Sequence, residues 1–322
     1  MTGSVPPLAA PDDALLRLAA ALRDSGYRFT TITPASHARV NGRPGNAWAR
    51  TLADVFGWSR PFRPDLLPPP MFELMQRAGI AARHDEGWGE GWRSLLRLSS
   101  LDGELFLHSA FPTGQEDAVF FGPDTYRFAA AIAAHLGVRR APLRRAVDIG
   151  CGAGPGAVLI ARAHPEADVL AIDINGAALR LARINAALAG TRNVVPRRGD
   201  LLSGIEGAFD LIVANPPYLV DPAGRAYRHG GGALGAGLSE AIVAAASDRL
   251  APGGTLLLYT GAAVVNGTDP FRAAVQAQLS GSSLAWSYRE VDPDVFGEEL
   301  AGGAYAEADR IAAIVLTATR PG

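Results

Sequence analysis

The sequence predicts an α/β fold, with a doubly wound, mostly parallel sheet, a C-terminal antiparallel strand pair and a smaller N-terminal α+β module. From about Asp117 onward, apolar strand-like runs alternate with helical periodicity. This alternation is typical of βαβ units, whose parallel sheet is covered on both faces. The last two strand-like runs have no convincing helix between them, which indicates the antiparallel pair. Before Asp117 the pattern changes to short helices and one hairpin signal.

The length and composition set the number of domains and exclude several kinds of chemistry. The chain has 322 residues, 48% of them hydrophobic and 19% charged, with a formal net charge of −2. This length suits two domains, and we expect a helical and hairpin module over residues 1–115 and an α/β domain over residues 116–322. All 30 basic residues are arginine. The sequence therefore excludes a P-loop lysine, a Schiff base and a lysine general base.

Cysteine, histidine and targeting signals are informative mainly by their absence. The single cysteine, Cys151, excludes an internal disulfide and a multi-cysteine zinc site. The six histidines are scattered without metal-ligand spacing, so no metal is expected. Residues 1–7 have neither the basic region nor the apolar core of a signal peptide, and no apolar run approaches the ~18 residues that a membrane span needs. We expect a cytoplasmic protein with no membrane partner.

The N-terminal module is predicted to hold three helices and a hairpin. Apolar periodicity and the proline breakers between segments predict helices over Asp12–Leu22, Ala47–Trp58 and Met71–Ala78. Strands over Trp92–Leu98 and Glu104–His108 flank a turn at Asp102-Gly103. Three helices followed by a hairpin resemble a winged-helix-like module.

The α/β domain is predicted to hold five parallel strands before its terminal pair. These strands are expected over Arg145–Ile149, Val169–Ile172, Asn193–Pro196, Leu211–Ala214 and Thr255–Tyr259. Helices are expected over Gly156–His164, Ala177–Ala189 and Ser239–Leu250. The antiparallel pair is expected over Leu284–Val291 and Ile311–Ala318.

A glycine-rich loop lies where the first of these strands meets a helix. It runs Gly150-Cys151-Gly152-Ala153-Gly154 and is preceded by Asp148. Glycines at such a place let the backbone approach a ligand, and the helix N-terminus offers unpaired N–H donors. The dinucleotide fingerprint GxGxxG fails because Pro155 occupies its third glycine position. By itself, the remaining GxGxG pattern fits a tight turn as well as a ligand site.

Two further acids favour the ligand site. Asp173 ends the next strand, 19 residues after Gly154, which suits hydrogen bonds from ribose hydroxyls. Asp200 follows the third strand, where a carboxylate could accept a hydrogen bond from the amino group of adenine. Because parallel strands share one carboxyl edge, these acids and the glycine loop are expected to line one nucleoside site.

These motifs resemble those of class I S-adenosylmethionine (SAM)-dependent methyltransferases, which have a Rossmann-like fold. The resemblance implies that SAM is the cofactor and S-adenosylhomocysteine the product. It assigns the first acid and the glycines to the methionine part of SAM and the strand-end acid to the ribose. The implied cofactor-binding residues are Thr125, Asp148, Gly150, Cys151, Gly152, Gly154, Asp173, Ile174, Asp200, Leu201 and Asn215. A nucleophilic role for Cys151 is disfavoured, because no histidine base lies within twelve residues.

The tetrad Asn215-Pro216-Pro217-Tyr218 follows the fourth strand, at the same edge of the sheet. Two prolines fix the backbone and remove two N–H donors, which leaves carbonyls free to accept. The Asn215 side-chain oxygen and the Pro216 carbonyl could both accept from one substrate NH₂ group and align its nitrogen with the methyl of SAM. Tyr218 would supply a flat face for a planar amide or base. A proline-terminated turn is the alternative, but the position after an adenine-type acid favours a catalytic tetrad.

The tetrad resembles the motif of methyltransferases that act on exocyclic amino groups of adenine or guanine and on glutamine side chains. Two further stretches, Pro123-Asp124-Thr125 and Gly230–Leu238, resemble the protein-(glutamine-N5) methyltransferase family, also called HemK-like. In that family, the first of these stretches lies over the SAM site. The resemblance covers roughly residues 117–318 and implies catalytic roles for Asn215, Pro216, Pro217 and Tyr218.

Three functions are therefore compared. The first is a SAM-dependent N-methyltransferase acting on a protein glutamine, with the N-terminal module docking the partner. The second is the same chemistry on RNA or DNA, at adenine N6 or guanine N2. It is disfavoured because residues 1–115 hold 12 arginines against 11 acids, without the basic footprint of a nucleic-acid reader. The third is a non-catalytic SAM-binding module, which the intact tetrad disfavours. We expect a macromolecular acceptor, protein rather than nucleic acid; the sequence leaves the oligomeric state open.

Overall fold

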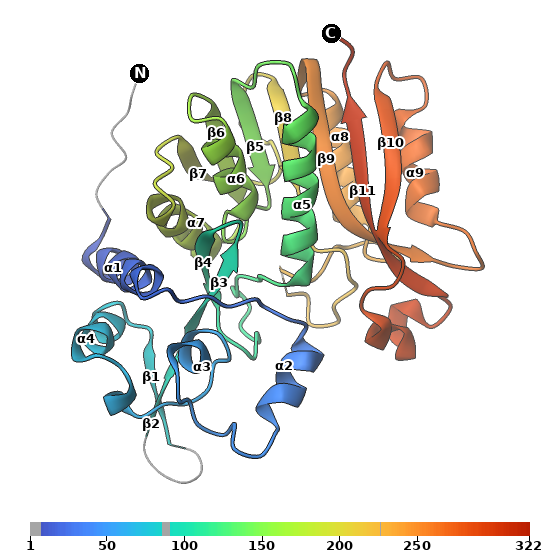
Figure 1. Cartoon of the computed structure of the whole chain (residues 1–322). Coiled ribbons are helices and arrows are strands. Elements are labelled where there is room, and N and C mark those ends of the chain that lie inside the picture. The colour runs from blue at the N-terminus through green and yellow to red at the C-terminus, as the bar shows by residue number, and fades with distance from the viewer. Residues whose placement is uncertain (1–7, 86–90, 226) are drawn as a thin grey trace.

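The structure is a computed structural model, and it describes residues 8–85, 91–225 and 227–322. Residues 1–7, on which the search for a signal peptide rested, lie outside the described residues. Figure 1 shows a twisted sheet with helices on both faces, and the N-terminal elements gathered beside one of its edges.

The central sheet has seven strands in the order β10-β11-β9-β8-β5-β6-β7. Its strands are β5 (Arg145–Ile149), β6 (Asp168–Asp173), β7 (Val194–Arg198), β8 (Phe209–Ala214), β9 (Leu250–Val264), β10 (Ala285–Asp292) and β11 (Arg310–Thr319). The neighbours from β7 to β9 pair in parallel, whereas β11 lies antiparallel to both β9 and β10. The predicted doubly wound sheet with a C-terminal antiparallel pair is confirmed, and one reversed strand, β11, accounts for that pair.

Helices cover both faces of the sheet. One face carries α5 (Pro123–Val138), α6 (Pro155–Ala163) and α7 (Gly176–Leu188), and the other carries α8 (Gly237–Ser247) and α9 (Pro270–Leu279). Alternate strand residues serve the two faces: on β5, Ala146 joins the core under α5–α7 and Val147 joins the core under α8 and α9. Between β10 and β11 lie two short 3₁₀ helices, η2 (Gly297–Ala301) and η3 (Gly303–Tyr305).

Over residues 8–85 and 91–115, the N-terminal part holds four α-helices, a short 3₁₀ helix and two strand pairs. Its elements are α1 (Ala10–Asp24), α2 (Pro34–Asn41), α3 (Leu52–Phe56), η1 (Pro64–Leu66), α4 (Pro69–Arg77), β1 (Ala81–His84), β2 (Gly91–Ser94), β3 (Leu96–Leu101) and β4 (Glu104–Ser109). The predicted hairpin is confirmed as β3 and β4, joined at Asp102 and Gly103, whose φ angles are 49° and 83°. Such positive φ values at both central residues are typical of a tight hairpin turn.

Two predictions for this part are wrong. The strand expected over Trp92–Leu98 breaks at Leu95 into β2 and β3, because β2 pairs with β1 instead of with β4. The helix expected over Ala47–Trp58 is only α3, since Thr51 and Asp54 form a capping box that starts it late. Helix α2 was not predicted at all. The winged-helix-like character of this part stays a prediction.

The N-terminal part packs against the α7 side of the sheet. Leu15 and Leu18 of α1 belong to the same hydrophobic cluster as Leu181 of α7, and Arg180 Nε lies 2.6 Å from Asp12 Oδ1. The predicted boundary between residues 115 and 116 therefore separates two parts that share a core, and it stays a prediction. Among the described helices, none is long and apolar enough to cross a membrane.

Candidate active site

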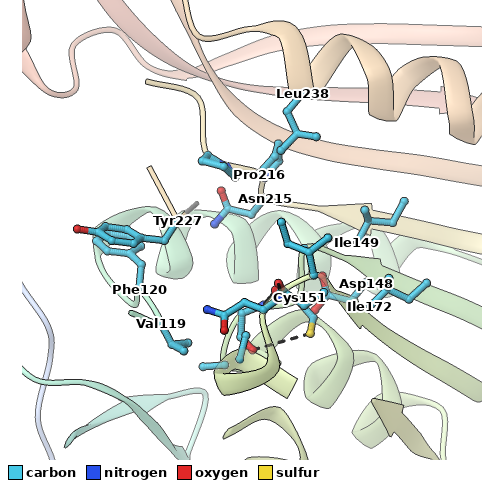
Figure 2. A pocket seen from close by; sticks show the side chains of 18 of the residues that line it. Val119, Phe120, Asp148, Ile149, Cys151, Ile172, Asn215, Pro216, Tyr227 and Leu238 are labelled. Carbon is cyan, nitrogen blue, oxygen red and sulfur yellow. Dashed lines mark hydrogen bonds between the residues drawn. The ribbon is translucent and has the colours of Figure 1, made fainter. Parts of the chain in front are cut away.

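The chain segments that follow β5, β6, β7 and β8 meet at the carboxyl edge of the sheet and line a pocket (Figure 2). The pocket brings together nearly all residues predicted from the sequence. They are Thr125, Asp148, Gly150, Cys151, Gly152, Asp173, Ile174, Asp200, Leu201, Asn215, Pro216, Pro217 and Tyr218. Gly154 is not among its lining residues, because it packs against Ala182 of α7. Proteins with open α/β sheets bind their ligands at the carboxyl ends of the parallel strands.

Two glycines set the shape of the glycine loop. Gly154 has a φ of 82°, and a Cβ there would lie 3.0 Å from the Cβ of Ala182. Gly156 lies in the first turn of α6, and a Cβ there would lie 2.7 Å from Asp148 Oδ2. The first glycine lets the loop sit on α7, and the second lets the buried carboxylate reach the start of α6.

Asp148 is buried at the base of the pocket. Its Oδ2 accepts a hydrogen bond of 2.9 Å from the Ala157 N–H. The pKa of Asp148 is raised to about 7, chiefly by burial; the hydrogen bond from Ala157 opposes this rise and the nearby charge of Asp173 adds to it. A ligand that carries positive charge would therefore favour the ionised form of this carboxylate.

This shift predicts a pH dependence for the binding of SAM, the cationic cofactor that the motifs imply. A cation binds the ionised carboxylate better, so affinity should fall as the pH drops below about 7 and Asp148 takes up a proton. We expect the dissociation constant for SAM to rise about tenfold per pH unit between pH 6.5 and 5.5. Calorimetry at several pH values across this range measures the dissociation constant. The Asp148→Asn variant should bind SAM more weakly, and its dissociation constant should no longer depend on pH in this range. If the dissociation constant of that variant rose as steeply, a group other than Asp148 would cause the pH dependence.

Asp173 ends β6 with both carboxylate oxygens facing the loop backbone. Oδ2 accepts from the Gly152 N–H and Oδ1 from the Asn175 N–H, each at 2.9 Å. Burial raises the pKa of Asp173, and these bonds oppose the rise. Beside it, the Ile174 side chain is 55% exposed, although large aliphatic side chains are usually buried. A carboxylate beside an exposed apolar side chain suits a ribose joined to a planar base.

Cys151 lies inside the loop but is not poised as a nucleophile. Burial raises the pKa of its thiol well above the ordinary value, and Asp148 and Asp173 raise it further. The thiol donates a long bond of 3.8 Å to the Gly152 carbonyl. The structure thus agrees with the expectation that Cys151 only lines the site.

Asn215 presents a free amide to the pocket. The side chain is partly exposed, and within the described residues no hydrogen bond holds its amide. Figure 2 shows it pointing toward the side of the pocket where Phe120 and Tyr227 lie. Tyr227 is fixed there, because its hydroxyl donates to the Thr113 carbonyl at 2.8 Å. The amide is therefore available to a ligand that enters beside these two rings.

Tyr218 differs from the expectation of an open stacking face. Its side chain is only 6% exposed. The ring lies edge-on to Phe296, with 5.8 Å between centroids, and covers Gly261, where a Cβ would come within 2.2 Å of it. The hydroxyl donates to Asp124 Oδ2 at 2.7 Å. A buried carboxylate binds this hydroxyl strongly, so Tyr218 is held as part of the wall.

Asp124 is a buried residue of this site whose contacts the sequence did not predict. Besides Tyr218, it accepts a 2.7 Å bond from the Tyr259 hydroxyl of β9 and a 3.2 Å bond from Arg127. Arg127 also reaches Asp292 at 2.6 Å. Within the Pro123-Asp124-Thr125 stretch, the sequence predicts a cofactor-binding role for Thr125 alone. The Thr125 hydroxyl in fact accepts from the Gly122 N–H at 3.2 Å.

The hydrogen bonds to Asp124 predict that the Tyr218 and Tyr259 hydroxyls contribute equally to stability but differently to activity. Each Tyr→Phe change removes one hydroxyl from the buried Asp124, so each should lower the free energy of unfolding by about 1–2 kcal/mol. Only Tyr218→Phe also frees a residue of the tetrad, and it should reduce the methyl transfer that the motifs imply by about tenfold. Tyr259→Phe is the matched control. Thermal unfolding and label transfer measure the two effects, and equal activities in both variants would exclude a role for the Tyr218 hydroxyl.

The residues of the pocket fit SAM better than a metal or a bare nucleotide. Four carboxylates line it, and a Cβ atom at Gly150 or at Gly152 would meet no atom within 4 Å, so the loop leaves an open cradle. Acids suit ribose hydroxyls and a cationic ligand, whereas they would repel a phosphate. Within the described part of the chain, no group of three His, Cys, Asp or Glu side chains could hold a metal ion.

Comparison with known proteins agrees with this chemistry. Residues 129–267 match the family model "Methyltransferase small domain". The release factor glutamine methyltransferase of Deinococcus radiodurans is 39% identical over 176 residues, which cover 50% of this chain and 58% of that protein. The ribosomal protein uL3 glutamine methyltransferase of Bordetella pertussis is 38% identical over 149 residues, covering 42% and 49%. The chain thus spans about half the length of the curated relatives it matches. The resemblance that the motifs indicated is confirmed.

Among solved structures, wild-type Trm5b from Pyrococcus abyssi aligns with a TM-score of 0.50. The alignment covers 80% of this chain and 68% of Trm5b, at 16% sequence identity. At that identity the likeness concerns the fold alone, and the fold is the Rossmann-like α/β fold that the sequence predicted.

Proposed function

We propose that this chain, whose residues 129–267 match the methyltransferase small domain, is a SAM-dependent N-methyltransferase acting on the side-chain amide of a protein glutamine. The observation that carries the proposal is the free amide of Asn215, set in the same pocket as Asp148, Asp173 and the glycine loop. A cofactor pocket alone would serve many acceptors. The Asn-Pro-Pro-Tyr tetrad at its wall favours an NH₂ acceptor.

The cofactor would be held by residues of three loops. Asp148 and the glycine loop would hold the methionine part, Asp173 the ribose and Asp200 the adenine amino group. Bound there, SAM supplies an electrophilic methyl group on a sulfonium and leaves as S-adenosylhomocysteine. Ile174 gives the base an apolar neighbour at the rim of the pocket.

The tetrad residues would orient the acceptor. The Asn215 Oδ1 and the Pro216 carbonyl accept the two hydrogens of the acceptor NH₂ group, which fixes its plane and its nitrogen. An amide nitrogen is a weak nucleophile because its lone pair is delocalised, so orientation carries much of the rate. Pro217 keeps the turn rigid. Tyr218, tied to Asp124 by the 2.7 Å bond, keeps the wall in place. The released proton goes to solvent.

A protein acceptor is supported by the named substrates of the relatives and by the charge of the chain. The relatives from Deinococcus radiodurans and Bordetella pertussis are named for a release factor and a ribosomal protein. Residues 1–115 carry 12 arginines and 11 acids, a balance that favours a protein partner over a nucleic acid. Docking of that partner by the N-terminal part, and a cytoplasmic location, belong to the same proposal.

Transfer of radiolabelled methyl groups tests the function. The purified full chain is incubated with methyl-labelled SAM and an extract of cells that lack the enzyme, and the products are treated with protease or nuclease. We expect label that protease releases and nuclease does not. Label that survives protease and is released by nuclease would instead assign the chain to the nucleic-acid acceptors. Cofactor binding without any label, in extracts shown to contain unmethylated acceptor, would favour a binding module.

A further inference from the structure

Asn185, on α7, makes three hydrogen bonds to the backbone of two distant segments. Its side chain is fully buried. Its Oδ1 accepts from the Leu107 N–H at 2.8 Å, and its Nδ2 donates to the Leu107 carbonyl at 3.0 Å. The amide thus pairs with both backbone groups of one β4 residue, as a neighbouring strand would. The second hydrogen of Nδ2 goes to the Ala153 carbonyl at 2.8 Å.

Ala153 lies in the middle of the glycine loop, so one amide links the N-terminal hairpin to the cofactor pocket. The contact with the loop is reinforced one turn earlier on α7, where Ala182 lies against Gly154. The same helix is tied to α1 by the Arg180–Asp12 ion pair and by a 3.0 Å bond from Arg23 to the Leu188 carbonyl. Helix α7 therefore contacts the glycine loop as well as α1 and β4.

We infer that Asn185 is a positioning residue for cofactor binding, which fixes the glycine loop through Ala153 and couples it to strand β4. The inference rests on the proposed function, since it concerns the same pocket. Without the Asn185 donors, the buried Ala153 carbonyl loses its partner, and the loop relaxes away from its ligand-ready shape. The coupling is reciprocal: whatever orders the loop also orders β4, and whatever docks on the N-terminal part and orders β4 raises affinity for the cofactor.

The chain offers a matched control in Asn193. Its Nδ2 also bonds only to backbone carbonyls, those of Ala161, His164 and Ala167, the shortest at 2.9 Å. Asn193 precedes β7, at the sheet edge opposite the glycine loop. Replacing either asparagine by aspartate removes its N–H donors from backbone carbonyls with little change of shape. Only the change at Asn185 touches the cofactor loop.

Calorimetry with S-adenosylhomocysteine compares the two variants at matched temperature and pH. We expect Asn185→Asp to weaken binding by about tenfold or more, and Asn193→Asp by less than about twofold, even where their melting temperatures fall by similar amounts. Equal affinities in wild type and Asn185→Asp would overturn the inference. If the wild type binds neither SAM nor S-adenosylhomocysteine, the proposed function falls as well.

Hydrogen exchange on the wild type tests the coupling even if Asn185→Asp does not fold. The Leu107 N–H bonds to Asn185 and lies outside the cofactor pocket. Saturation with S-adenosylhomocysteine should slow its exchange about threefold or more relative to the Leu98 N–H on the partner strand. Unchanged exchange at Leu107, with full occupancy of the pocket, would overturn the coupling.

Discussion

Asn215→Ala should reduce methyl transfer by about a thousandfold or more while leaving the dissociation constant of SAM within about threefold. Within the described chain the Asn215 side chain makes no hydrogen bond, so its removal should not destabilise the fold, and its amide faces the pocket. Its loss therefore removes an interaction made with the acceptor alone. Orientation of a weak nucleophile accounts for an effect of this size. Label transfer at saturating SAM measures the rate, and calorimetry measures the affinity.

Asn215→Asp provides the control for this result. Aspartate keeps an acceptor oxygen at nearly the same place, so it should retain more transfer than alanine. If Asn215→Ala turned over like the wild type, Asn215 would have no part in the mechanism. If it lost SAM binding in parallel with activity, its role would lie in the cofactor site instead.

Asp173→Ala should weaken SAM binding by about a hundredfold. The carboxylate holds the Gly152 and Asn175 N–H groups at 2.9 Å and would also bind the ribose hydroxyls. Losing a charge-assisted acceptor of this kind costs about 2–3 kcal/mol. Asp200→Ala, at an exposed place on the rim, should cost only a few-fold. Calorimetry measures the loss of SAM affinity in both variants. A larger loss in Asp200→Ala than in Asp173→Ala would contradict the assignment of Asp173 to the ribose.

The part of the site that lies at strand ends could be predicted from the sequence. Asp148, Asp173, Asp200 and Asn215 each lie at or near the end of a strand, and parallel strands bring their carboxyl ends to one edge whatever their order. That geometry follows from the strand–helix alternation alone. The position of the turn at Asp102 and Gly103 is equally local, since it depends on the conformations those two residues adopt.

The contacts between distant segments could not be predicted. Tyr218 is buried because Asp124, 94 positions earlier, accepts its hydroxyl, and Gly261, on another strand, lies against its ring. Asn185 looks like an ordinary helix residue until β4 is placed beside α7. Helix α9 was missed although it carries a local signal: Phe271, Val275 and Leu279 recur at four-residue spacing behind the N-cap residue Asp269. No local pattern records which segments meet.

Mass spectrometry of the methylated acceptor tests the central claim most directly. The protein labelled by the full chain in the extract is isolated, digested and sequenced by fragmentation, with the Asn215→Ala product as the blank. The account predicts a single added methyl group on the side-chain amide nitrogen of a glutamine, absent from the blank. A methyl group on a nucleobase, or on an oxygen, sulfur or carbon atom of a protein, would contradict it.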